Sequence, residues 1–583
     1  MIEKYYEEEL RYLYESGKEF AKAHPDRAQF LNIDSVGDRD PYVERLFEGF
    51  AFLAARIREK LDDSFPQLTE GIINLLWPQL LQEIPSTAIV QFSPRAGLLQ
   101  DTKILPRGSE VLSNPVGPES HVCRFITTQD VLLSPISITG VEKVTDTKGN
   151  EILTFHFQLD PGASWNSCAF KSIRLYLYAE FPTALMLHEN LTTSILKAQL
   201  TVNNGQCTVS LEPSGAITPG GLSADNALLP GDQRSFWGYS LLREYFVYAE
   251  KFLFIDLNGF DTLPFCDPEP QSFTYTVTVS KQFATDKPFG AENFRLFCSP
   301  VVNLYQRETE PVTRDGLKSE YHITADVSAP QSVFVHSIIS VTGIDRVTGE
   351  RYEYEPFYNF RNINNRQIRT FASRYVNTAG GKRELLLVPG GSQTTDDGEL
   401  REENLSIMAW CSNGEIPRDY IREGGINRPG KGFPDYVRIT NITRPTLPYS
   451  PPEDDNYLWM FQSHLSSTWA SLASADVFKN FLKIYDWSRQ EGRTRRIEAI
   501  TEVTSEPTET IIKGCPVRGV CVTITLRETE FRDSGDIHLF GEVINQFLGQ
   551  FVSINSFLKL IFVQKPSGKT MEWNPNEGKR CLI

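Results

Sequence analysis

The sequence lacks any long apolar run and any obvious targeting segment. No window of 18 consecutive apolar residues occurs, so no transmembrane helix is expected. The chain opens with MIEKYYEEEL, which has no apolar core of the kind that defines a secretory signal peptide. These two absences predict a cytoplasmic protein that does not insert into a membrane.

The short motifs that mark common active sites are also missing. The phosphate-binding patterns GxxxxGKS/T and GxGxxG do not occur, nor do the zinc-protease motif HExxH or the hydrolase motif GxSxG. A calcium loop of the form DxDxDG is absent. Only eight histidines are present, and His464, in FQSHLSS, has the spacing of a packed or capping residue. We therefore expect no catalytic residue, no cofactor and no metal site.

Cysteine spacing and net charge restrict the class further. Nine cysteines are scattered along the chain without a CxxC pair or zinc-ligand spacing, which predicts reduced, buried thiols. The 58 basic and 74 acidic side chains give a formal net charge of −16. An acidic surface of this kind argues against nucleic acid or an anionic membrane as the main partner.

What the sequence has in quantity is aromatic residues, above all 37 phenylalanines among 583 residues. A chain of this length exceeds what one hydrophobic core supports and suggests about four domains. So high an aromatic content favours large cores and large interfaces. The predicted fold class is α+β multidomain, with an N-terminal helical segment, β-rich middle domains and a C-terminal mixed α+β module.

Three regions before the C-terminal module follow from changes of pattern along the chain. Residues 1–85 carry apolar side chains at helical spacing and form the predicted helical segment. Residues 86–290 consist of short β-branched and aromatic runs between turn residues, and a helix and strand at 237–257 form a helical insertion in this β-rich domain. Residues 291–455 repeat the pattern as a second β-rich domain, which ends in the linker-like run PTLPYSPPEDDN.

Residues 456–583 alternate between helical and strand patterns. The run RRIEAITEVTSE (495–506) predicts a strand, RGVCVTITLRETEF a second strand, DIHLFGEVINQFLGQFVSIN a helix and SFLKLIFVQK a last strand. With the helical stretch before them, these elements have the order of a split βαβ module. Its short basic run, Arg493, Arg495 and Arg496, is expected to be either a solvated face or a contact with an acidic neighbour.

The helix predicted at residues 40–63, DPYVERLFEGFAFLAARIREKLDD, is the most informative in the chain. Asp40 can cap its N-terminus, and Pro41 suits its first turn, where no backbone N–H is needed. Apolar residues then recur every three or four positions, and the helix is expected to end near residues 64–66. A further helix, QLTEGIINLLWPQLL, should follow and be broken by Pro78.

The 40–63 helix is apolar on more than one side. Phe47, Phe50 and Phe52 lie within six residues of one another, so they cannot share a single face. A helix with so wide an apolar surface needs neighbours on most of its sides. A self-contained three-helix domain, later parts of the same chain or helices of other chains could cover it, and the residue pattern leaves these alternatives open.

Segments along the whole chain carry a resemblance to a known family. They are YYEEELRYLYESGKEFAKAHPDRAQFL, the 40–63 helix, LPRGSEV, CRFITTQDV, YFVYAEKFLFIDLNGF, CSPVVNLYQRETEPV, CSNGEIP, RGVCVTITLRETEF and FVSINSF. In content and order these segments resemble the TssF family (also called VasA or ImpG), the baseplate wedge subunits of bacterial type VI secretion systems. Residues 140–230 and 380–403 resemble the family more loosely.

The resemblance implies a structural, non-enzymatic protein with several protein partners. Members of the family assemble with TssG, two TssF copies to one TssG, into a wedge that also carries TssE and TssK, and six wedges surround the VgrG hub. The resemblance therefore implies a position at the cytoplasmic face of the inner membrane, in contact with neighbouring TssF copies.

The resemblance also implies which residues meet a partner, because the N-terminal helices of the family join those of TssG in a core bundle. In this sequence the role falls on Tyr5, Tyr6, Leu10, Leu13, Phe47, Phe50, Phe52, Leu53 and Ile57. The accompanying hypothesis is mechanical. The helical bundle would be the rigid centre of the wedge, and the C-terminal module would make subunit contacts that change when the machine fires.

Two other classes of function remain alternatives. An enzyme with an unrecognised site would require a deep pocket that holds titratable groups with perturbed pKa values. A β-rich module that binds carbohydrate or peptide would require aromatic side chains such as Trp237 or Trp410 to be exposed in a groove.

Overall fold

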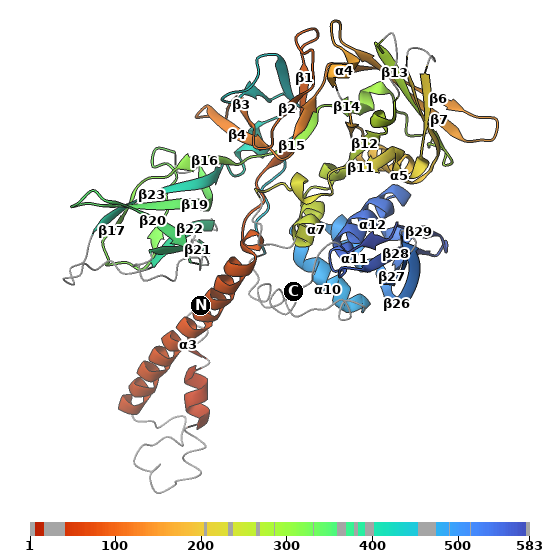
Figure 1. Cartoon of the computed structure of the whole chain (residues 1–583). Coiled ribbons are helices and arrows are strands. Elements are labelled where there is room, and N and C mark those ends of the chain that lie inside the picture. The colour runs from red at the N-terminus through yellow and green to blue at the C-terminus, as the bar shows by residue number, and fades with distance from the viewer. Residues whose placement is uncertain are drawn as a thin grey trace. The chain divides into compact units, whose positions relative to one another are not determined.

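The computed structural model describes the chain from residue 6 to residue 578, with internal gaps. The residues left out between these ends are 8, 17–40, 169, 203–206, 231–236, 264–268, 285, 330–331, 358–368, 378–382, 391–401, 453–473, 489 and 513–514. The chain divides into two compact units, residues 1–76 with 453–463 and residues 77–452 with 464–583. Each unit has its own set of elements (Figure 1).

The first unit is built on one long helix, α3 (Pro41–Leu76), of 36 residues. Helical residues within 6–16 belong to the same unit. The predicted end of the helix near residues 64–66 is wrong, because α3 continues through Pro66. A proline removes one backbone donor, and a long helix can continue past it when no better end is available. The sequence offers no glycine for a C-cap until Gly71.

Helix α3 ends directly before Trp77 and Pro78, which confirms the predicted break. Trp77 has φ −145° and ψ 66°, outside the helical region, and Pro78 starts the short 3-10 turn η1 (Pro78–Leu80). A proline disfavours helical backbone at the residue before it, which explains why the end falls at this position. The proposed cap Asp40 lies outside the described residues.

A six-stranded sheet lies at the start of the second unit, in the strand order β24-β3-β4-β15-β1-β25 (Figure 1). Its core includes the fully buried side chains of Phe92, Val111 and Phe125. The prediction placed a domain boundary between residues 290 and 291, yet strands from both sides of that position share this sheet. The strands are β1 (Thr87–Pro94), β3 (Glu110–Val116), β4 (His121–Thr127), β15 (Cys298–Val302), β24 (Ile426–Pro429) and β25 (Val437–Asn441).

Two further sheets follow, one of five strands (β10-β9-β13-β7-β6) and one of four (β11-β12-β8-β14). Every second residue of strands β7 and β13 is buried, and the residues between are half-buried or, at Gln158, exposed, as expected for the period of two in a strand. The strands are β6 (Ile136–Thr145), β7 (Glu151–Leu159), β8 (Ser172–Leu177), β9 (Ile195–Val202), β10 (Cys207–Leu211), β11 (Ile217–Pro219), β12 (Phe254–Asn258), β13 (Ser272–Val279) and β14 (Phe294–Leu296).

Two helices accompany these sheets, α5 (Phe181–Thr193) and α7 (Trp237–Val247). The helix and strand predicted at 237–257 are confirmed as α7 followed by β12. Shorter elements complete the region: β2 (Lys103–Leu105), β5 (Val131–Leu133), α4 (Trp165–Cys168), α6 (Pro213–Ala216), η3 (Ala224–Asn226), η4 (Ala249–Phe252), η5 (Phe260–Thr262), η6 (Ala291–Asn293) and α8 (Ile416–Tyr420).

An eight-stranded sheet contains the remaining strands of the middle of the chain, in the order β16-β23-β19-β20-β21-β22-β18, with β17 also paired to β23. Val341, Leu387, Leu405 and Ile407 lie in its buried core. The strands are β16 (Tyr305–Glu308), β17 (Val312–Arg314), β18 (Tyr321–His322), β19 (Phe334–Asp345), β20 (Arg351–Pro356), β21 (Thr370–Asn377), β22 (Arg383–Gly390) and β23 (Glu403–Ser412).

The C-terminal part has the predicted order of helix, two strands, helix and strand. Strands β27 and β28 pair in parallel and are joined through α12, while β26 and β27 form an antiparallel hairpin. The elements are α10 (Ala475–Tyr485), α11 (Glu491–Glu498), β26 (Ile500–Ile512), β27 (Cys515–Arg527), η8 (Glu528–Glu530), α12 (Ser534–Gly549), β28 (Ser556–Lys565), β29 (Thr570–Glu572) and β30 (Asn576–Glu577).

One strand boundary in this part was predicted wrongly. The segment 495–506 was expected to be a strand throughout, but Arg495 and Arg496 lie in helix α11 and the strand begins only at Ile500. Ile497 is buried on helix α11, and pairing of the strand with β27 begins only at Ile500.

Aromatic side chains join the C-terminal part to the helices of the middle of the chain. Tyr239 of α7 stacks in parallel on Tyr485 of α10, with ring centroids 5.7 Å apart. Its ring also lies 6.2 Å from that of Phe547 on α12. Figure 1 shows α7, α10, α11 and α12 gathered beside the C-terminal strands. These ring contacts form a hydrophobic cluster shared by α7, α10 and α12.

The basic run of the C-terminal part is divided between core and solvent. Arg496 is buried, and its guanidinium forms an ion pair with Asp536 of α12 at 2.9 Å and donates a hydrogen bond to the Tyr245 hydroxyl of α7 at 3.2 Å. Arg495 is exposed and lies 3.6 Å from Glu491. The expected contact with an acidic neighbour is therefore confirmed for Arg496, and the run is not a single solvated face.

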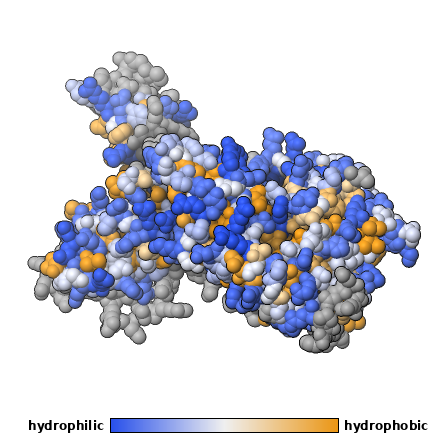
Figure 2. All heavy atoms as spheres, turned by 90° about the horizontal axis from the view of Figure 1, so that it is seen from above, coloured by the Kyte–Doolittle hydropathy of each residue, from blue (hydrophilic) through white to orange (hydrophobic). Residues whose placement is uncertain are grey.

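Hydrophilic residues cover most of the surface shown in Figure 2, and hydrophobic residues appear between them in several groups. Within the described parts of the chain, no helix is both long and apolar enough to cross a membrane.

The buried ion pair gives a first prediction. Replacing Arg496 with Met should lower the stability of the C-terminal part by about 3–5 kcal/mol, because Asp536 is left buried without its cation. The urea midpoint of unfolding, followed by tryptophan fluorescence, measures this change. The matched substitution Arg495→Met should change stability by less than about 1 kcal/mol, because that pair is exposed. Equal losses in the two variants would contradict the role assigned to the buried pair.

Candidate subunit interface

One face of α3 is covered within its own unit. The ring of Phe47 lies edge-on to that of Tyr14, with centroids 6.1 Å apart. Ala51 and Ala55 follow on the same face at intervals of one turn and are fully buried. Partial desolvation and the nearby Glu48 carboxylate raise the pKa of the Tyr6 phenol, which places Tyr6 beside α3 as well. Because alanine carries only a methyl group, its burial indicates close approach of a neighbouring segment.

A second face of α3 is exposed and apolar. The exposed fractions are 79% for Tyr42, 69% for Leu46, 60% for Phe50, 56% for Leu53 and 55% for Ile57. These residues follow one another at steps of four, four, three and four positions, which places them in one line along the helix. We call these five residues the apolar stripe.

The spacing of the apolar stripe determines the kind of partner that fits it. Steps of three and four residues form the seam of paired helices, in which each side chain inserts between residues of the facing helix. Full burial of one such side chain is worth ~1.5–3 kcal/mol, so covering all five would stabilise a complex by several kcal/mol. The stripe is therefore suited to a helix of a protein partner.

The structure separates the nine residues predicted for the core bundle into groups. Those that are half-buried within the first unit are Tyr6, Leu10, Leu13 and Phe47. Those on the apolar stripe are Phe50, Leu53 and Ile57. Phe52 is 49% exposed but lies on a different side of the helix, and Tyr5 lies outside the described residues.

Two members of the apolar stripe were missed from the sequence, Tyr42 and Leu46. Leu46 lies one turn and Tyr42 two turns before Phe50 on the same side of α3, so the helical period of the sequence was sufficient to predict them. The prediction weighted the cluster of phenylalanines instead, and Phe47 and Phe52 point away from the line that the exposed residues form.

The residues that follow α3 are fixed to helix α7. The Gln79 side chain accepts a hydrogen bond from the Ser240 hydroxyl at 2.6 Å, and the Arg243 guanidinium donates to the Gln79 backbone carbonyl. The Trp77 ring lies edge-on to that of Tyr239 at 6.1 Å. The chain therefore passes from the long helix directly into a buried, hydrogen-bonded attachment.

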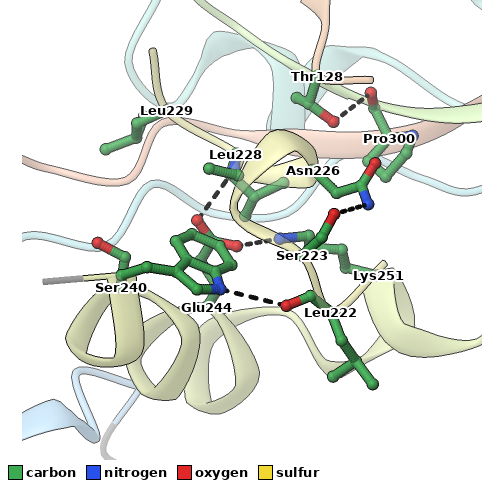
Figure 3. Close-up of polar contacts among 12 residues, drawn as sticks. Thr128, Leu222, Ser223, Asn226, Leu228, Leu229, Ser240, Glu244, Lys251 and Pro300 are labelled. Carbon is green, nitrogen blue, oxygen red and sulfur yellow. Dashed lines mark hydrogen bonds and ion pairs between the residues drawn. The ribbon is translucent and has the colours of Figure 1, made fainter. Parts of the chain in front are cut away.

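A buried ion pair fixes the loop that faces α7 (Figure 3). Glu244 accepts a hydrogen bond from the Leu228 backbone N–H at 2.9 Å and pairs with the ammonium of Lys251. Burial lowers the pKa of Lys251, although Glu244 opposes this effect. Lys251 also lies 5.2 Å from the centre of the Trp237 ring, whose N–H donates to the Leu222 carbonyl at 3.1 Å.

These contacts bear on the ligand-binding alternative. The indole N–H of Trp237 is hydrogen-bonded to a backbone carbonyl of the same chain, and Trp410 is half-buried within β23. Neither tryptophan has the exposure in a groove that a carbohydrate- or peptide-binding module would require.

Three titratable groups with strongly shifted pKa values lie together in one helix–helix contact. Burial lowers the pKa of His188 on α5 and of His538 on α12 to about 3, and their ring centroids are 5.8 Å apart. Burial raises the pKa of Glu542, one turn along α12, to about 7. All three side chains are less than 10% exposed. Among the described residues, no group of three or more potential ligands could hold a metal ion.

Known proteins are similar to this chain over almost its whole length. The family model for the type VI secretion system protein TssF matches residues 1–580. The chain belongs to the TssF family. A relative, component TssF1 of the type VI secretion system of Pseudomonas aeruginosa, is 27% identical over 619 residues, which cover 99% of this chain and 98% of the relative.

Two solved structures are similar to this TssF family member over most of its length. A chain of the TssK-TssF-TssG baseplate subcomplex, solved by cryo-electron microscopy, has a TM-score of 0.79 and 32% identity, covering 93% of this chain and 100% of the other. A chain of the baseplate complex from the type VI secretion system has a TM-score of 0.63 and 31% identity, with 100% of both chains covered. The protein is a baseplate component of a type VI secretion system.

The buried histidines predict a loss of stability in acid. In the unfolded chain each histidine binds a proton near pH 6.5, but in the fold only near pH 3, so stability falls as the pH drops from 6.5 towards 3. Glu542 acts in the opposite direction between pH 7 and 4.5, since its folded pKa is raised, and burial also raises the pKa values of Glu83, Asp486 and Asp536. His336, whose pKa burial lowers to about 4, adds to the effect of the two histidines, which titrate over the wider pH range. The temperature at the midpoint of thermal unfolding should therefore be lower at pH 5 than at pH 6.5.

A pair of variants checks this origin. His188→Gln should reduce the fall of the thermal midpoint, because one of the two buried groups no longer titrates. His322→Gln is the control, because His322 is exposed. An unchanged pH dependence in the His188 variant would show that the acid sensitivity arises elsewhere.

Proposed function

We propose that this TssF family member uses the apolar stripe of α3 to bind helices of TssG in the baseplate wedge. The observation that carries the proposal is a line of five apolar side chains, each more than half exposed, at the spacing of a helix–helix seam. The related cryo-electron microscopy structure contains TssG and TssK together with TssF, which supports the identity of the partner.

The finer assembly that we propose follows the family resemblance. Two copies of the chain combine with one TssG, the wedge contacts TssK, TssE and neighbouring TssF copies, and six wedges surround the VgrG hub. The assembly lies in the cytoplasm at the inner face of the inner membrane. The function is structural, without catalysis or cofactor, which is supported by the burial of the perturbed histidines in a helix contact.

The attachment of α3 supports a load-carrying role for this helix. Its last residue is followed directly by Trp77 and Gln79, which are held to α7 by ring contacts and hydrogen bonds. A partner bound to the apolar stripe is therefore connected through one continuous helix to the buried core of the second unit. We propose that the bundle is the rigid centre of the wedge.

Two phenylalanines on different sides of α3 provide a matched test. Phe50→Asp places a carboxylate in the middle of the apolar stripe and should reduce copurification of co-expressed TssG at least tenfold, because an unpaired charge would be buried. Phe52→Asp makes the same chemical change at a position of similar exposure outside the stripe, and TssG should remain bound.

The comparison is made with the full-length chain and a tagged TssG. Circular dichroism and gel filtration of both variants establish that the chains fold alike. Retention of TssG by the Phe50 variant, or equal loss in both variants, would rule out the apolar stripe as the binding surface.

A further inference from the structure

Strand β26 is a free edge of the C-terminal sheet. It stands at one end of the strand order β26-β27-β28-β29, so only one of its sides is paired (Figure 1). It has 13 residues, which makes it the longest edge strand in the described part of the chain. From position 504 to position 511 its side chains are exposed or half-buried. An edge of this length presents a row of backbone groups with which another strand can pair.

The hydrogen-bond pattern shows which backbone groups of β26 point away from the sheet. The Arg527 N–H donates to the Ala499 carbonyl at 2.9 Å, so Arg527 and every second residue of β27 before it face β26. Positions 525, 523 and 521 are opposite positions 502, 504 and 506. These even-numbered residues of β26 therefore bond to β27, and the odd-numbered residues from 503 onwards direct their N–H and C=O groups outwards.

Three residues form the first part of this outward ladder. Val503 and Ser505 each offer an N–H donor and a C=O acceptor, whereas Pro507 offers only its carbonyl, because proline has no N–H. Among the described residues, no backbone hydrogen bond from another segment reaches these groups. Proline at an outward position leaves the bonds to β27 intact and interrupts only the free edge. The ladder from Val503 to Pro507 is therefore intact towards β27 and open towards solvent.

Two carboxylates lie at the ends of this ladder, on the open face of the sheet. The Val503 side chain is buried, so Glu502, Thr504 and Glu506 point to the opposite face. All three are exposed. Within the described parts of the chain, neither Glu502 nor Glu506 forms an ion pair, whereas Glu509 pairs with Arg518 at 2.9 Å. The open face beside the ladder thus carries two acidic groups four residues apart, with a threonine between them.

We propose that β26 pairs with an extended segment of another baseplate subunit that carries lysine or arginine at two positions four residues apart. The backbone of this segment completes the ladder from Val503 to Pro507. Its two basic side chains lie on the open face beside Glu502 and Glu506, as cross-strand neighbours of opposite charge. The contact lies in the second unit and uses backbone hydrogen bonds, so it goes beyond the helix seam of the proposed function.

Charge selects this partner over a second copy of β26. The strand contains three glutamates and no basic residue, so pairing two copies would bring like charges together on neighbouring strands. Acidic side chains and a proline also discourage apolar strands from adding to an edge. A basic strand is the one class for which the same side chains are attractive, and this combination of attraction and exclusion produces specificity.

Site-specific photo-crosslinking in the purified baseplate complex tests the contact. Benzoylphenylalanine is placed at position 504, between the two glutamates, or at position 511 as the control, because Ile511 is 75% exposed in the same strand beyond Pro507. Position 504 should crosslink to one subunit at least fivefold more than position 511. Mass spectrometry should place the adduct in a segment with two basic residues four positions apart. Equal yields, or an adduct in β26 of a second copy, would overturn the proposal.

A charge exchange tests the choice of partner. With the crosslinker at position 504, Glu502→Lys combined with Glu506→Lys should lower the yield at least fivefold, because like charges then face each other. Glutamate at the two basic positions of the crosslinked segment should restore the yield. An unchanged yield in the lysine variant would contradict the proposed pairing of charges.

The backbone contribution has its own matched pair of variants. Ser505→Pro removes an outward N–H without removing a bond to β27, and it should lower the crosslink yield at least threefold. Ser505→Thr keeps the N–H and should leave the yield unchanged. Far-UV circular dichroism establishes that both chains fold alike. Equal yields in the two variants would show that the ladder is not used.

These variants leave the apolar stripe unchanged, so co-expressed TssG should copurify with each of them as with the unchanged chain. Absence of the crosslink therefore contradicts the strand contact alone, and retention of TssG by Phe50→Asp contradicts the proposed function alone.

Discussion

The structure depends above all on how apolar surface is covered along one long helix. One side of helix α3 is covered within its own unit, where Phe47 packs against Tyr14 and buried alanines allow close packing. The side chains of its other apolar side, from Tyr42 to Ile57, are each more than half exposed. Burial of such side chains is the main favourable term in both folding and association, so the same principle that forms the first unit also drives it towards a partner. In the proposed function, folding and assembly are therefore successive stages of one process.

The second unit contains many sheets, whose positions relative to the neighbouring loops and helices must be fixed. It does so with a few buried charges that are each paired: Glu244 with Lys251, Arg496 with Asp536 and Glu403 with Arg369. Such pairs add little net stability compared with apolar packing, but an alternative arrangement would leave a charge buried alone. They therefore favour one arrangement of loops and helices over its alternatives.

The sequence predicts the parts of this molecule in which local pattern and tertiary environment agree. The α+β class, the C-terminal βαβ order and the apolar character of α3 follow from periodicity and composition. The passage of α3 through Pro66 could not be predicted, because a local rule on proline competes with the length of the surrounding helix. Tertiary contact also decides that Arg496 is internal. Strand pairing places both Arg314 and Asp345 opposite Glu403, although 31 positions separate the two residues.

The junction between α3 and η1 has a geometric consequence. A 36-residue helix with a rise of about 1.5 Å per residue is a rod about 54 Å long, and a single non-helical residue, Trp77, joins it to the fixed Gln79.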